Sequence, residues 1–281
     1  MSALVSRTGA LFRLELAEAM RSRWLVFTGA VYSLVFGVFI WLGLRESSVL
    51  GFTGMSRVVL NVANAMVLTI PLVALVATSQ SIVRARSSGF FELFLSQPVR
   101  RTEWLKATLL ARACVVVAPL VVLLLLALAF SLGEGSDGTL GPMVLRSLVV
   151  VAGLAWAFVG IGLWISSAAK SAERATVLAL VAWLGAAMLH DFALIGILLR
   201  WRLPAELVFV LAAVNPVESS RIAILGGIDP ELSVLGPVGF WLANGLGARW
   251  SMVIGVGWPV LLGTVAMVLA ARRLNRSDLV G

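Results

Sequence analysis

The chain's single histidine stands beside an acidic residue inside an apolar segment. His190 and Asp191 fall in the outer third of the apolar run 175–199. Burying an ionisable group in hydrocarbon is costly, so such a group is by default a candidate for lining a path or gate. The structural alternative is a pair that forms hydrogen bonds inside a helix bundle near the membrane interface. Both interpretations stay open at this point.

Most motifs that carry catalysis or bind metal are missing from the sequence. It contains no GxxxxGK[ST] phosphate loop and no CxxC, HExxH or GxSxG motif. One cysteine, Cys114, and one histidine supply neither an internal disulfide nor the usual His/Cys metal site. We therefore expect no catalytic residue, no metal site and no cofactor bound by this chain. The charged residues expected within the membrane are few, namely Arg112, His190 and Asp191, which argues weakly against an ion-driven carrier.

A second candidate for chemistry is the stretch 82–106, where aromatic residues stand between arginines. Ser87 or Ser88 is suited to begin a helix there, and Gln97-Pro98 is suited to end it. The apolar face of this predicted helix 87–97 consists of Phe90, Phe91, Phe94 and Leu95. Glu92 lies on another face, and Arg84 and Arg86 precede the helix. An exposed apolar helix face is a common docking element for a partner protein. The alternative is a helix that rests on the lipid interface.

The elements that position these residues are predicted to be membrane-spanning helices. The chain is 60% apolar and 13% charged, with a mean hydropathy of +1.01, whereas soluble domains have about 45–50% apolar and about 25% charged residues. Six segments have the length of a span and none alternates like a strand. They are residues 24–44, 58–81, 107–132, 144–168, 175–199 and 251–271. The fold class is therefore all-α and polytopic.

Charge distribution predicts the orientation. Lys and Arg are about twice as frequent on the side that carries both termini and the stretch 82–106 as on the opposite side. Because cytoplasmic loops collect basic residues, we expect both termini in the cytoplasm. The same bias accounts for the net charge of +8 without a nucleic-acid partner.

The remaining segments are assigned from their composition. Residues 1–23 are expected to be an amphipathic, interfacial N-terminus that contacts lipid, followed by the transmembrane domain 24–271 and a basic cytoplasmic tail 272–281. The longest outer segment is 200–250. It contains the Asn215-Pro216 break and, three residues apart, Glu218 and Arg221, which pair on a helix or bind a partner.

The run from Ser88 to Arg101, followed by Glu103-Trp104-Leu105-Lys106, resembles the loop after the second span in type-2 ABC transporter permeases. Their pattern has a glycine, Glu-Leu, apolar residues, Ser-x-Pro-Val and a lysine. The stretch 14–23 followed by Trp24 resembles their N-terminal elbow helix. The resemblance implies a coupling helix that docks on an ATPase through the residues named above.

A narrower resemblance covers most of the chain. Permeases that mature nitrous-oxide reductase have similar motifs in three places. These are Trp41-Leu42-Gly43 with Gly51-Phe52-Thr53, Asp191 in the fifth span, and Asn215-Pro216 with Arg221. This implies a homodimer in the cell inner membrane with two copies of a separate ATPase, which would hold ATP and Mg. It also implies an extracytoplasmic partner protein, for which Asn215, Pro216, Glu218 and Arg221 would be contacts.

The sequence thus favours the membrane subunit of an ATP-driven ABC transporter without enzymatic activity of its own. Its cargo would be a lipid, peptide or drug, or movement alone would pass to an outer protein through 200–250. The first alternative is a secondary carrier or channel, whose transport persists without ATP. The second is a membrane anchor or assembly factor that shows no nucleotide-dependent movement.

Overall fold

A computed structural model describes residues 2–21, 23–45, 55–96, 99–133, 140–226 and 247–276 of the chain. Within these ranges the regular structure is helical and contains no strand. Outside the described residues lie Gly51-Phe52-Thr53, Gln97-Pro98, residues 227–246 of the segment 200–250, and residues 277–281 of the tail.

The helices follow the chain in a simple order. They are α1 (Ser2–Arg21), α2 (Arg23–Arg45), α3 (Met55–Thr78), α4 (Ser81–Ser87), α5 (Phe90–Leu95), α6 (Arg101–Gly133), α7 (Leu140–Ala168), α8 (Ala172–Leu184), the π-helix η1 (Gly185–Leu189), α9 (His190–Arg200), α10 (Ala205–Ala213), α11 (Pro216–Leu225) and α13 (Gly247–Arg276). The six segments predicted to span the membrane are helical, except that segment 58–81 crosses the break at 79–80 between α3 and α4.

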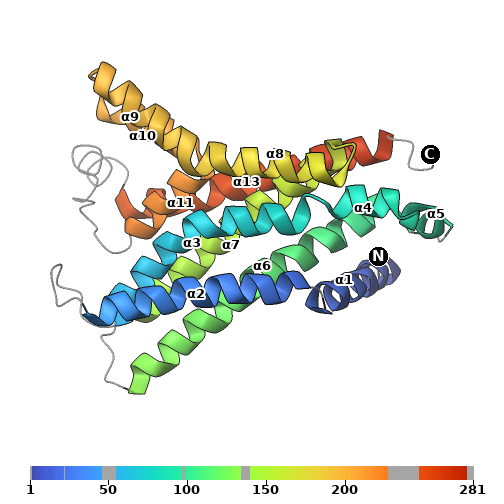
Figure 1. Cartoon of the computed structure of the whole chain (residues 1–281), viewed down its shortest axis with the longest axis horizontal. Coiled ribbons are helices and arrows are strands. Elements are labelled where there is room, and N and C mark those ends of the chain that lie inside the picture. Colours follow the sequence, from blue (N-terminus) through green and yellow to red (C-terminus); the bar gives the residue numbers. More distant parts are fainter. Residues whose placement is uncertain are drawn as a thin grey trace.

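The long helices run side by side, and the short ones gather at the two ends of the bundle (Figure 1). Helices α1, α4 and α5 and the C-terminal end of α13 lie at one end, here called the α5 end. Helices α9, α10 and α11 lie toward the opposite end, here called the α10 end, where the α9–α10 hairpin projects from the bundle.

Length and composition confirm an integral membrane protein with five to seven candidate spans in the described residues. Five helices qualify alone: Asn61–Ser87, Arg101–Leu126, Gly141–Ala168, Ala172–Arg200 and Arg249–Arg276. Two bent pairs qualify as broken helices, namely Gly9–Arg21 with Leu25–Phe39, bent by 61°, and Ala205–Ala213 with Pro216–Leu225, bent by 116°. The second pair lies in the stretch that the sequence placed outside the spans, so α10 and α11 form a candidate re-entrant element.

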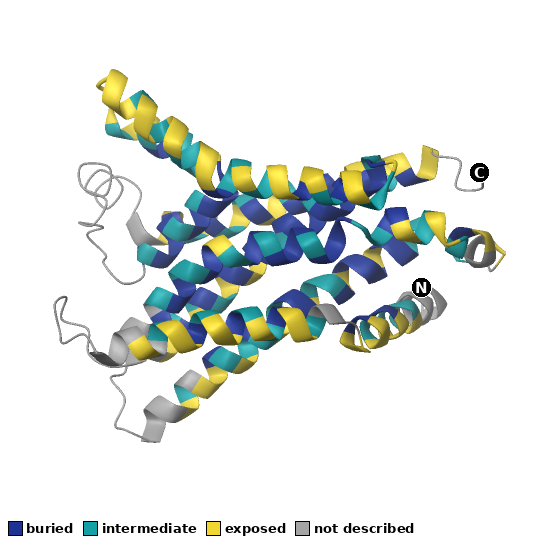
Figure 2. Ribbon diagram, in the orientation of Figure 1, coloured by how far each residue is buried: buried dark blue, intermediate teal, exposed yellow. Residues whose placement is uncertain are grey.

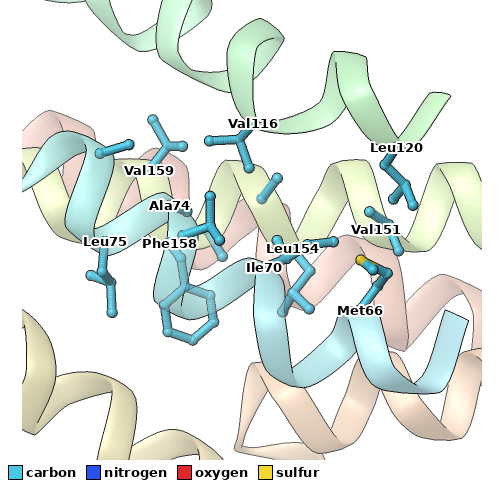
Figure 3. Close-up of a cluster of buried hydrophobic side chains, with 14 of the residues drawn as sticks. Met66, Ile70, Ala74, Leu75, Val116, Leu120, Val151, Leu154, Phe158 and Val159 are labelled. Atoms are coloured by element: carbon cyan, nitrogen blue, oxygen red, sulfur yellow. The ribbon is translucent and has the colours of Figure 1, made fainter. Parts of the chain in front are cut away.

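The buried core lies between α3, α6 and α7. Met66 and Ile70 of α3 meet Leu120 of α6 and Leu154 and Phe158 of α7 (Figure 3). Burial is uneven across the bundle: 67% of the apolar window is buried in α3 and in α7, but only 11% in the Ala172–Arg200 segment. Exposed positions accordingly follow α8 and α9 over their length (Figure 2). That surface must be covered by lipid or by another protein.

Small residues let α7 and α13 approach at backbone distance. A Cβ on Gly160 of α7 would clash with the backbone of Gly263 on α13, and a Cβ on Gly263 would meet the Trp156 carbonyl oxygen at 2.6 Å and Ala157 Cα at 2.8 Å. Membrane helices pack through such small-residue contacts because apolar side chains gain little by leaving lipid. The glycines therefore hold this helix pair together.

Gly263→Ala is expected to lower the free energy of unfolding by about 1–3 kcal/mol, because the added methyl group forces α7 and α13 apart. Gly257→Ala is the matched control on the same helix, since a Cβ there meets nothing within 4 Å. Thermal unfolding of the purified chain in detergent measures both. Equal melting temperatures for the two variants would contradict the backbone contact.

The stretch 82–106 is more helical than the sequence indicated. Helix α4 continues α3 after a break at 79–80, α5 is shorter than the predicted 87–97, and α6 begins at Arg101 rather than 107. The expectation that Ser87 or Ser88 begins the docking helix is wrong. Their hydroxyls donate to the carbonyl oxygens of Arg84 (3.1 Å) and Ala85 (3.3 Å), so they end α4. Gly89, at φ 70°, forms the turn into α5.

Candidate functional site

An aromatic cluster fixes α5 to the start of α6. The ring centroids of Phe91 and Trp104 lie 5.0 Å apart, edge to face, and Phe90 lies 5.7 Å from Phe91 and 5.8 Å from Trp104. Phe91 is only 1% exposed and Trp104 only 3%. Such aromatic pairs add stability beyond the area that they bury. Helix α5 is therefore attached rigidly and is not a free amphipathic segment.

The same tryptophan joins α6 to the N-terminal helix. Trp104 Nε1 donates a 2.7 Å hydrogen bond to Glu15 Oε1 on α1, and Glu15 is 8% exposed. Burial raises the pKa of the Glu15 carboxyl above its ordinary value, while the Trp104 hydrogen bond and the charge of Arg112 oppose the rise. A buried carboxylate with one directed donor holds α1 in a defined position against α6.

Helix α4 is anchored by two polar contacts from neighbouring helices. The first backbone N–H groups of a helix lack partners within it. Here the amides of Ile82 and Val83 donate to Ser166 Oγ of α7, at 2.9 and 3.2 Å. Gln80 Nε2 donates to Thr176 Oγ1 of α8 at 2.6 Å. The break between α3 and α4 is thus held by α7 and α8.

The residues predicted to dock on the ATPase differ in how far they are exposed to solvent. Phe91 is 1% exposed, so the chain itself covers this side chain, and its assignment as a docking contact stays a prediction. Phe90 is partly covered, Glu92 and Arg84 are exposed, and Arg86 is half-buried. Phe94 and Leu95 belong to α5, but their side chains lie outside the described residues. The remaining docking surface is more polar than the sequence predicted.

At the α10 end, Asn215 connects α11 to the π-helix. Its Oδ1 accepts from the Val217 amide at 3.0 Å and caps α11, while Pro216 occupies the first turn, as is common in helices. Its Nδ2 donates to the Ala186 carbonyl oxygen of η1 at 2.6 Å. Asn215 is 5% exposed and Pro216 is buried, so the chain itself covers both side chains, and their role as contacts for an outer partner stays a prediction.

An ion-pair group lies next to this cap. Arg221 Nη1 of α11 lies 2.5 Å from Glu218 Oε1 and 3.5 Å from Asp191 Oδ2 of α9. The adjacent His190 is half-buried, and its Nε2 has no hydrogen-bond partner in the described chain. The sequence treated His190–Asp191 and Glu218–Arg221 as separate features, and the fold brings them together. Together with Asn215 they form what we call the outer cluster, after the side of the membrane on which the sequence predicts it.

The comparisons with known proteins agree with this architecture. The family model described as "ABC-2 family transporter protein" matches residues 10–279. The chain belongs to the ABC-2 transporter family. It is thus the membrane permease subunit of an ABC transporter, and this membership implies association with an ABC ATPase.

Two curated relatives of the permease are each named "Probable ABC transporter permease protein NosY". The protein from Stutzerimonas stutzeri is 26% identical over 262 residues, covering 92% of this chain and 93% of its own length. The protein from Pseudomonas aeruginosa (strain PAO1) is 28% identical over 236 residues, covering 77% of this chain and 81% of its own. The resemblance to type-2 ABC permeases is therefore confirmed over nearly the whole chain.

Sequence reasoning missed the residues that hold the permease's α5 end together. Trp104 was noted only as part of the family pattern, and Glu15 was not singled out within the predicted interfacial segment 1–23. The sequence offered little indication of this contact, because the position of Trp104, six residues after Pro98, does not indicate which distant residue it contacts. Ser166 and Thr176 gave no signal, because hydroxyl side chains are common in membrane helices and their partners lie far away in the chain.

Ser166→Ala is expected to lower the free energy of unfolding by about 1–3 kcal/mol, because two buried amides of α4 lose their acceptor. Ser167→Ala is the matched control, since Ser167 is also buried but donates only to the Trp164 carbonyl oxygen of its own helix. Hydrogen exchange of the 81–87 amides, measured by mass spectrometry, should accelerate in the Ser166 variant alone. Equal exchange in both variants would exclude the anchoring role.

Proposed function

We propose that this permease couples ATP binding and hydrolysis by a separate cytoplasmic ATPase to a movement of its outer end. The observation that carries the proposal is the attachment of α5. This short helix lies at the extreme of the bundle (Figure 1) and is tied into it by the buried pair Phe91–Trp104. A force applied to its exposed side would reach α6 directly and, through Glu15, α1.

A second route from α5 runs through α4. Its N-terminal amides rest on Ser166 of α7, and Gln80 at its start binds Thr176 of α8. Helix α8 continues through η1 into α9, where Asp191 pairs with Arg221 of α11. A polar contact therefore stands at each junction between α4 and the re-entrant element. Rigid elements joined by such contacts are suited to carry a two-state change over this distance.

The proposed assembly contains two permeases and two ATPases, with ATP and Mg on the ATPases and no enzymatic activity in this chain. The weakly buried face of α8 and α9 supports a second copy as its cover, since a twofold pair uses one surface twice. Movement at the outer cluster would then either export a cargo or pass to an extracytoplasmic protein. Glu218 and Arg221, which are partly exposed, remain the proposed contacts for that protein.

Two variants on α5 are expected to distinguish a residue that docks on the ATPase from a residue that packs inside the permease. Glu92→Arg reverses an exposed charge and should release the ATPase while leaving thermal stability unchanged. Phe91→Ala opens a cavity against Trp104 and should cost about 3–5 kcal/mol of stability. The measurements are ATPase copurification, ATP turnover in proteoliposomes and the mass of the detergent-solubilised complex.

Glu173→Arg is the control for this experiment, because it reverses an exposed charge in the first turn of α8 at the same end of the bundle. It should leave a complex of two permeases and two ATPases intact. Full retention and coupling of the ATPase by Glu92→Arg would refute docking at α5. Transport that continues after ATP depletion would instead identify an ATP-independent carrier.

The α5 end is proposed to face the cytoplasm, and thiol labelling tests this orientation. In a Cys114→Ala background, Arg202→Cys between α9 and α10 should react with a membrane-impermeant maleimide in intact cells, because Arg202 is exposed. Glu92→Cys should react only after the membrane is permeabilised. The reverse pattern would invert the topology and move the ATPase site to the other end.

A further inference from the structure

A cavity of about 360 Å³ opens at the α5 end between α1, α3, α4 and α6. Its charged lining comes from three of these helices: Glu15 and Glu18 from α1, Arg84 from α4, and Arg112 from α6. Neutral polar groups are added by Gln80, Ser81, Ser88 and Thr108. Phe90 and Trp104 form part of its apolar wall. The cavity adjoins the surface proposed for the ATPase and shares Arg84 and Phe90 with it, whereas none of its lining belongs to the outer cluster.

The charges around this cavity balance without pairing directly. Two carboxylates stand on the α1 side and two guanidinium groups on the α4 and α6 side, so the formal sum is zero. In the described part of the chain no ion pair joins any two of these four groups. Arg112 Nε is buried and has no hydrogen-bond partner there. Glu18 and Arg84 are exposed and Arg112 is half-buried, so these groups have hydrogen-bonding capacity that a ligand supplying both signs would satisfy.

The position of the cavity suggests where such a ligand comes from. Helix α1 forms one wall, and its exposed side chains include Leu14, 60% exposed, and Met20, 55% exposed. A helix with exposed leucine and methionine beside charged residues is typical of the membrane interface, where phospholipid headgroups lie. Arg112 lies about two turns beyond Trp104 on α6, and a long arginine side chain can extend along the helix toward lipid phosphates.

We propose that this cavity binds the headgroup of a zwitterionic phospholipid carrying a primary ammonium group, as in phosphatidylethanolamine. The phosphate lies between Arg84 and Arg112, for which it is the preferred oxyanion partner. The ammonium group lies near Glu18 and Glu15. An anionic lipid or a nucleotide would satisfy the arginines but leave the two carboxylates facing further negative charge. A bound lipid would join α1 to α4 and α6, a role that requires no ATPase.

Native mass spectrometry of the full-length chain tests the proposal. The chain is released from nanodiscs that contain equal amounts of phosphatidylethanolamine and phosphatidylglycerol, and the retained lipid is counted. The parent should keep one phosphatidylethanolamine per chain. Arg112→Gln and Arg84→Gln should each lower retention of both lipids about tenfold, because the phosphate loses a charged donor. Arg84 is exposed, so its variant leaves the packing intact if Arg112→Gln fails to fold.

Glu18→Gln provides the decisive readout. Glu18 is exposed and removing its charge should lower phosphatidylethanolamine retention about tenfold while phosphatidylglycerol retention rises, so that the preference reverses. A purely structural effect would change both lipids equally. Glu173→Gln and Arg174→Gln on α8 are matched controls, since both residues are exposed at the same end but outside the cavity. They should retain lipid like the parent.

Three results would overturn the proposal. One is equal retention of the two lipids by the parent, and another is an unchanged preference in Glu18→Gln. The third is displacement of the lipid by millimolar glycerophosphoethanolamine, which would assign the cavity to a water-soluble phosphate–ammonium compound. Retention in the presence of that compound supports the lipid. Because no ATPase is present, failure here leaves the coupling mechanism standing, and failure of coupling leaves the lipid site standing.

Discussion

The structure depends on one constraint: a helix that breaks inside a bilayer must satisfy its freed backbone groups with partners from other helices. Water is not available there, and each unpaired group costs several kcal/mol. In its described part the chain has two helix breaks, both within candidate spans, that are closed by a distant side chain. Ser166 accepts the amides at the start of α4, and Asn215 donates to the Ala186 carbonyl oxygen of η1. Each partner therefore determines both where a helix breaks and which neighbour it must follow.

These contacts account for the defined arrangement of a bundle of apolar helices. Lipid provides no hydrophobic drive for helix association, so specificity must come from close packing and from polar pairs. At the α5 end the pairs are Glu15–Trp104 and Gln80–Thr176. At the α10 end, Arg146 Nε donates to the Ala223 carbonyl oxygen near the end of α11, at 2.7 Å. The polar contacts thus lie at the two ends of the bundle, and the glycine contacts let α7 and α13 pack closely.

The sequence predicted the helices well and their contacts poorly. Spans were recognisable because a run of about twenty apolar residues is rare outside membrane helices, and the family was recognisable from a local motif in 88–106. Helix boundaries near that motif were wrong, because charged residues at 82–86 and 101–106 do not look like a span although they continue one as helix. The burial of Phe91 was not predictable, since an aromatic on an amphipathic turn has the same pattern whether it faces Trp104 or a partner protein.

The outer cluster was predictable only in its parts. His190, Asp191, Glu218 and Arg221 were singled out because ionisable groups are rare in this chain, but about thirty residues separate the two pairs, and no sequence period links them. Their meeting depends on the α9–α10 hairpin and on the 116° bend between α10 and α11. Asn215 was recognised as a break, whereas its bond to η1 required the fold.

The π-helix has a consequence for the direction in which α9 presents its side chains. A π-turn accommodates one residue more than an α-turn, and each residue of an α-helix advances the helix by about 100° around its axis. Five residues of η1 therefore set the azimuth of everything that follows, including Asp191 immediately beyond it. With an uninterrupted α-helix from Ala172, Asp191 would point about a quarter-turn away from Arg221. The π-helix thus determines the rotation of α9 about its axis, and the hydrogen bond from Asn215 to the Ala186 carbonyl oxygen stabilises it.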